Sequence, residues 1–207
     1  MVRLPTSPFP PLVWMAAMYH QPVLELEACE HFIKQTWRNR FDIRGANGVQ
    51  TLSLSVEGMD GLKTPIRDVR LARENWAREH QQSIRSAYNS AAFGEHYMEE
   101  VLTLLAPQES LLYDYNLRIL RWILQEVGWK GEVVHSSHFQ KPEPEGLRAR
   151  FRRTKWTSLS FPPYEQVFSE KRGFEGNLSV LDLLFNLGPE AEVYLKSISL
   201  GRSAFQG

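Results

Sequence analysis

Residues 30–48 read EHFIKQTWRNRFDIRGANG, and this stretch determines how the segments on either side of it are expected to fold. Its last two residues, Asn47 and Gly48, are a strong hairpin-turn signal because both tolerate positive φ. Apolar residues at Leu52 and Leu54 then alternate with hydroxyl residues. The sequence therefore predicts two antiparallel strands, at residues 41–44 and 49–56.

The first half of the same stretch concentrates cations and amides in a way that packing does not explain. If residues 35–39 form a helical turn, Lys34 and Arg38 stand four residues apart on one face, beside Asn39 and Arg40. Lysine supplies a compact charge and arginine a planar fork of donors, a pair suited to holding phosphate or carboxylate. We therefore predict an anion-binding site here, and the residues leave open what is done to the anion.

The segment before this stretch, residues 23–28, alternates and predicts a half-buried strand with Glu25 and Glu27 on its polar face. Glu27 and Glu30 either face the cations or are their salt-bridge partners. Further along the chain, residues 65–71 alternate again and are predicted as another strand. The prolines of residues 1–11 favour an extended or turned segment, and residues 12–20 favour a short helix.

From Asn75 onward the apolar period changes from two residues to about four, which indicates helices. We expect a mixed α/β fold with a small central sheet from residues 23–71 and 132–137. Helices from residues 76–128 and 177–200 are expected to flank it. All 207 residues are expected to form a single domain.

The composition excludes several classes of protein. Lysine and arginine total 24 and aspartate and glutamate total 24, so the net charge is zero and gives no long-range attraction to nucleic acid or anionic membranes. A single cysteine, Cys29, precludes an internal disulfide and fits a reducing compartment. The apolar run at residues 12–18 is too short to span a bilayer. We expect a cytoplasmic protein without a membrane span.

Polar residues within the predicted helices are the other candidates for a site. His80 lies on the apolar face of its helix, as either a core histidine or a group at the edge of a site. Asn116 falls in an inward stripe, as either a hydrogen-bond clamp or a ligand contact. Ser179 and Asp182 fit a capping box, which is the simpler explanation of Asp182 than catalysis.

Several motifs of known chemistry are missing from the sequence. It has no glycine-rich phosphate loop and no zinc-ligand spacing, so no cofactor and no metal are expected. Ser136, Ser137 and His138 lack the glycines of a nucleophile elbow, which disfavours serine catalysis.

Residues 140–155 are predicted as a flexible or inserted loop and strand. Alternating arginines near their end form either a solvated face or a second contact to an extended anion. RNA binding through them is disfavoured by the neutral net charge.

Taken together, these stretches resemble the WbqC-like protein family over nearly the whole chain. The segments that carry the resemblance are Leu4–Thr6, Phe9–Pro11, Glu30–Arg40, Gly45–Gly48, Lys63–Ile66, Trp76 with His80 and Tyr88, Tyr164 with Gln166–Phe168, and Asn177–Asn186 with Gly188. The resemblance implies a bacterial cytosolic protein linked to surface-polysaccharide synthesis, such as O-antigen assembly, that modifies an activated sugar. It implies no particular catalytic residue.

The leading hypothesis is a transferase, of an acyl or aminoacyl type, that acts on a nucleotide-linked or other phosphate-bearing sugar. Its phosphate would be held by Lys34, Arg38 and Arg40, and a carbonyl or hydroxyl by Asn39. Either Glu30 or His80 would be the general base. Further candidates for substrate contacts are Asn116 and Gln166. The alternative is a non-catalytic module that binds a sugar nucleotide or a partner protein of the same pathway. The oligomeric state is left open.

Overall fold

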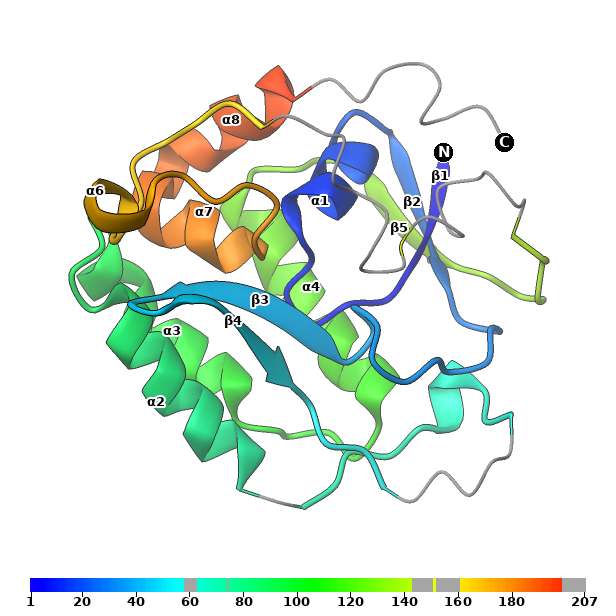
Figure 1. Cartoon of the computed structure of the whole chain (residues 1–207). Helices are drawn as coiled ribbons and strands as arrows, with labels where there is room; N and C mark the ends of the chain where they lie inside the picture. The colour runs from blue at the N-terminus through cyan, green and yellow to red at the C-terminus, as the bar shows by residue number, and fades with distance from the viewer. Residues whose placement is uncertain (58–62, 74, 143–150, 152–160, 199–207) are drawn as a thin grey trace.

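The structure, a computed structural model, describes residues 1–57, 63–73, 75–142, 151 and 161–198 (Figure 1). Its strands are β1 (Val2–Pro5), β2 (Val23–Glu27), β3 (Arg40–Gly45), β4 (Gly48–Ser53) and β5 (Glu132–His135). The helices are α1 (Leu12–Tyr19), α2 (Trp76–Tyr88), α3 (Gly94–Leu105), α4 (Leu112–Glu126), α6 (Ser169–Arg172), α7 (Val180–Leu187) and α8 (Ala191–Ser197). Two short 3₁₀ helices are η1 (Ile66–Asp68) and η2 (Gly188–Glu190). The predicted mixed α/β class is confirmed.

A parallel sheet with the strand order β1-β2-β5 forms one part of the molecule. β1 and β2 are joined through α1, and Val2 lies opposite Leu24 while Leu26 lies opposite His135. Every residue of α1 is buried, as expected for a helix that is apolar all round. The Trp14 indole fixes α1 to β1 by donating to the carbonyl of Pro5 at 2.9 Å.

The predicted hairpin is confirmed, and it forms a second, separate sheet. β3 pairs with β4 in antiparallel register, and Gly45 lies opposite Gly48 across the turn. Gly48 has a φ of 120°, which explains why the turn needs glycine there. In Figure 1 the hairpin lies between α2 and α3 on one side and α7 on the other, with α2 and α7 in contact with β3.

The strand predicted at residues 65–71 is wrong. Residues 66–68 form η1, and this part of the chain makes only isolated bridges, such as Val56 with Leu71. Ile66 and Val69 are buried three residues apart, a spacing that suits a helical turn rather than an alternating strand. The apolar residues that suggested an alternating strand are instead brought into the core by the turn of η1.

The predicted helical regions are confirmed by α2, α3, α4, α7 and α8. Together with α1 and both sheets they enclose one hydrophobic core. No helix among the described residues is long and apolar enough to cross a membrane. Most of the predicted loop at 140–155, namely residues 143–150 and 152–155 with their arginines, lies outside the described residues.

Candidate functional site

Buried polar side chains gather where the three parallel strands end. Thr6 and Ser7 follow β1, Glu27 ends β2, Glu30 follows it and Ser136 follows β5, and all five are at most 4% exposed. The carboxyl-terminal edge of a parallel sheet is where α/β proteins bind ligands. Burying polar groups costs stability unless they are paired. This edge is therefore the candidate functional site, and we call it the sheet edge.

Glu27 is the central group of the sheet edge. Its carboxylate is fully buried, its Oε1 accepts the Ser136 hydroxyl at 2.7 Å and the Cys29 N–H at 3.1 Å, and Arg3 lies 3.8 Å from Oε2. The Ser136 hydroxyl also accepts the Ala28 N–H, so it joins the ends of β2 and β5. Glu27 shares its strand face with Glu25, as predicted, since Arg3 contacts both, but Glu27 is fully buried rather than at the surface.

Glu30 and Arg38 form a buried ion pair. Arg38 donates from Nε and Nη2 to the two Glu30 carboxylate oxygens, both at 2.6 Å, and each side chain is 6% exposed. The two parallel bonds make this the strongest geometry for an arginine–carboxylate pair. Of the two roles open to Glu30, the structure shows that of salt-bridge partner. The Arg38 charge is neutralised by Glu30, so its main role here is to hold the loop.

Residues 31–39, which follow Glu30 and include Arg38, form a loop made of turns. The helical turn considered for residues 35–39 is absent, and Lys34 and Arg38 do not share a helix face. Gln35 has a φ of 62°, unusual for a residue other than glycine, and the Thr36 hydroxyl bonds the Ile33 carbonyl at 2.8 Å. Lys34 stays exposed at the tip of this held loop.

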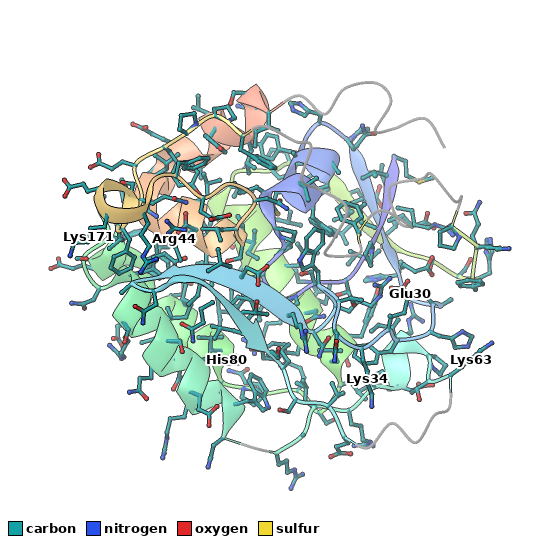
Figure 2. All side chains as sticks on the ribbon, viewed as in Figure 1. Glu30, Lys34, Arg44, Lys63, His80 and Lys171 are labelled. Atoms are coloured by element: carbon teal, nitrogen blue, oxygen red, sulfur yellow. The ribbon has the colours of Figure 1, made fainter. Side chains whose placement is uncertain are left out.

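A second lysine lies on the segment that runs beside the loop. The Phe32 N–H donates to the Thr64 carbonyl, and the Ile66 N–H donates to the Glu30 carbonyl. Lys63, which precedes Thr64, is exposed as Lys34 is. Figure 2 shows both lysines toward the same end of the molecule, well away from Lys171.

The amides near the loop serve mainly as clamps. Asn116 on α4 donates to the Arg38 carbonyl at 2.8 Å, and Asn39 donates to the Leu54 carbonyl at 3.1 Å. Within the described part of the chain, the side-chain oxygen of each amide is buried and has no hydrogen-bond partner. Arg40 is half-buried at the start of β3. The structure thus places Asn39, Arg40 and Asn116 around the base of the loop that carries Lys34.

His80 lies in a different place. It packs edge-on against Phe41 and lines an open cavity of about 360 Å³ between β4 and α2. Figure 2 shows it beneath the hairpin, apart from Glu30 and Lys34. Burial lowers the pKa of His80 from 6.5 to about 4, and a hydrogen bond to the Ser53 backbone offsets part of this shift. A neutral ring with so low a pKa is a weak base at neutral pH.

Acidification is expected to remove about 3 kcal/mol of stability through His80 between pH 7 and pH 4. The folded-state pKa lies below the unfolded value of 6.5, so the unfolded state binds the extra proton. The contribution is therefore complete above pH 6.5 and is lost as the pH falls through 4. Chemical denaturation of the wild type and His80→Gln at several pH values measures this.

The matched control is His96→Gln, which changes an exposed histidine on α3. Wild type and His96→Gln should lose stability in parallel, and His80→Gln should lose less. Identical pH dependence in all three proteins would contradict the assignment.

Asp182 and Gln166 belong to a third group, at the start of α7. The Asp182 carboxylate accepts the Tyr88 hydroxyl at 3.0 Å, the Tyr164 hydroxyl at 2.7 Å and the Gln166 amide at 2.7 Å. Burial raises the pKa of Asp182, and these bonds together with the Arg44 charge oppose the rise. The capping box is wrong, because α7 has no side-chain cap bond. The Asp182 carboxylate instead accepts hydrogen bonds from residues that are distant in the sequence.

Gln166 is held on both sides of its amide. Its Nε2 also donates to the Glu175 carbonyl at 3.0 Å, and its Oε1 accepts the Glu175 N–H at 2.9 Å. Gln166 therefore joins residues 164–175 to α7, away from the loop that carries Lys34. No group of three histidine, cysteine or acidic side chains in the described ranges is arranged to hold a metal ion.

Sequence reasoning did not single out Thr6, Ser7 or Ser136 as parts of one site. Each of them directly follows the end of a strand. That position would have predicted a shared site only if the three strands had been known to be parallel. Nothing in the local sequence pairs β1 and β5 with β2. The fold and the sheet edge thus define an α/β protein with a charge-paired polar site at the ends of its parallel strands.

Comparison with known proteins identifies the family of the chain. The chain belongs to the WbqC-like protein family, which matches residues 8–153. It is similar to the uncharacterized protein Rv1507c of Mycobacterium tuberculosis, with 27% identity over 197 residues, covering 80% of this chain and 84% of the relative. No solved structure matches the chain significantly.

Proposed function

We propose that the protein is a transferase that modifies an activated, phosphate-bearing sugar in bacterial surface-polysaccharide biosynthesis, and that it does so at the sheet edge. The observation that carries the proposal is the loop at residues 31–39. A buried ion pair to Glu30, which follows β2, and hydrogen bonds within the loop and to α4 hold this loop in place, and they leave Lys34 exposed. Sites that bind anions gain affinity when their cations are held in place beforehand.

In this proposal Lys34 and Lys63 hold the phosphate as two compact charges. Arg38 acts as the positioning residue for Lys34, because both of its donors to Glu30 are used in closing the loop. The transfer would break the bond between an acyl group and its thiol carrier and form an amide with an amino group of the sugar. Glu30 would take the proton of that amine and pass it to the departing sulfur, so that the carrier leaves as a thiol and the Glu30 carboxylate is regenerated.

One observation favours the second candidate, a non-catalytic module that binds the same phosphate-bearing ligand. Both Glu30 oxygens are engaged by Arg38, and His80 lines a separate cavity. Under this alternative Lys34 and Lys63 keep their role in binding, while no proton transfer takes place.

A thermal-shift screen against nucleotide sugars, acyl-CoA and inorganic phosphate tests the binding step. A ligand present at 100 times its Kd should add about 2.7 kcal/mol to the stability of the wild type. Lys34→Ala/Lys63→Ala should lose the gain given by a nucleotide sugar, and the fold is expected to stay intact because both lysines are exposed. Lys171→Ala, an exposed lysine on α6, is the matched control and should keep it.

Mass spectrometry then separates the two functions. Any stabilising sugar nucleotide is incubated with acyl-CoA, and an acylated sugar together with free CoA would support the transferase. Stabilisation without product would favour the binding module. If no ligand stabilised the wild type, or if the double variant retained every gain, the proposed site would be refuted.

A further inference from the structure

Another cavity, of about 330 Å³, lies between η1, the start of α4 and the end of β5. Four of its lining side chains are polar or charged, and two leucines supply apolar walls. The lining consists of Arg67, Leu111, Tyr113, Asp114, Leu117 and His135. A pocket of this size with a few convergent polar groups is typical of a small-molecule site.

The polar groups of this cavity are held in a fixed arrangement. The Tyr113 hydroxyl lies 2.7 Å from His135 Nδ1, and Tyr113 is only 4% exposed. The Arg67 guanidinium carbon lies 5.6 Å from the centre of the Tyr113 ring, within the range of a cation–π contact. Because Nδ1 of His135 is used by Tyr113, Nε2 is the ring nitrogen left to meet a ligand.

Charges from several elements act on this pair. Burial lowers the pKa of His135, and the positive charges of Arg67 and Arg121 lower it further. Burial raises the pKa of Tyr113 to about 12, with Arg67 opposing the rise and Glu27 and Asp114 adding to it. Two guanidinium groups therefore disfavour a third positive charge at His135, and a bound anion would relieve that repulsion.

We propose that this cavity binds the phosphate or carboxylate group of a small molecule, with Arg67 and His135 Nε2 as the contacts and Tyr113 as the positioning residue. Leu111 and Leu117 contact the apolar part of the same ligand. The Asp114 carboxylate confines the anionic group to the side of Arg67 and His135. The inference goes beyond the proposed function and does not depend on Lys34 or Lys63.

Titration of the histidine side chains by NMR tests the proposal, with inorganic phosphate and acetate as the two probes. Sodium chloride is exchanged for each probe at constant ionic strength, because screening alone would raise the pKa of a histidine near arginines. The pKa of His135 should rise by about half a unit or more, which corresponds to about threefold tighter binding by the protonated form. If only phosphate raised the pKa of His135, the ligand would be one that bears a phosphate group. If acetate raised it equally, the ligand would be one that bears a carboxylate.

Arg67→Gln should abolish the rise, and Arg70→Gln is the matched control on the same segment, because Arg70 is exposed and does not line the cavity. Tyr113→Phe should weaken the effect while the ring keeps its packing. The proposal is overturned if neither probe raises the pKa of His135, if His96 responds equally, or if Arg67→Gln behaves as the wild type. Lys34→Ala/Lys63→Ala should retain the rise, so failure here is distinct from failure of the proposed function.

Discussion

Arg38→Ala is expected to lower the free energy of unfolding by about 3–5 kcal/mol, as is typical when one partner of a buried ion pair is removed. The substitution leaves the Glu30 carboxylate buried at the sheet edge without its two 2.6 Å donors. It also removes the Nη1 contact to the Thr36 hydroxyl, which helps to hold the loop. Chemical denaturation measures the change.

Arg85→Ala is the matched control, since Arg85 pairs with Glu99 at 3.2 Å on the surface, where the two side chains are 55% and 83% exposed. Exposed pairs contribute about 0–1 kcal/mol, so this variant should stay close to the wild type. The double variant Arg38→Met/Glu30→Leu should recover part of the loss, because no charge is then left buried. A loss below about 1 kcal/mol in Arg38→Ala would contradict a buried pair.

Asp182→Ala is expected to lower the free energy of unfolding by about 3 kcal/mol or more, since each buried donor left unpaired costs about 1–3 kcal/mol. The substitution removes the acceptor of the Tyr88 hydroxyl, the Tyr164 hydroxyl and the Gln166 amide. It therefore uncouples α2 and residues 164–175 from α7. The loss of protection in hydrogen exchange should concentrate in these elements.

Tyr164→Phe provides a graded control for this cluster. It removes one donor and keeps the ring that packs against Phe174 and Tyr194, so the expected loss is about 1 kcal/mol. If Asp182 acted only as a helix cap, Asp182→Ala would cost about 1 kcal/mol and Tyr164→Phe almost nothing. Equal losses in the two variants would likewise argue against a shared acceptor.

The parts of the fold that the sequence predicted correctly depend on interactions between residues close together in the chain. Asn47 and Gly48 favour a turn whatever surrounds them, and the hairpin between β3 and β4 follows from them. The apolar period from Trp76 onward and the stripe of α7 depend only on neighbours within a few turns. The neutral composition and the single cysteine likewise needed no structure.

The candidate site was predicted only in part. The stretch from Glu30 to Arg40 was singled out because its cations and amides have no local packing role, and the structure places part of it at the sheet edge. Which of its cations stay free depends on partners: Arg38 is neutralised by Glu30, whereas Lys34 remains exposed. Single-residue patterns do not carry that information.

The sequence by itself determined the mixed α/β class, the hairpin and most of the helices, because these depend on contacts between residues near one another in the chain. Only the tertiary structure decided that β1, β2 and β5 are parallel, which brings Glu27 and Ser136 together across 109 positions. The tertiary structure alone also decided that the Asp182 carboxylate accepts the hydroxyls of Tyr88 and Tyr164 and does not cap a helix. A buried polar group takes the partner that the fold brings within hydrogen-bond reach, and that partner can lie anywhere along the chain.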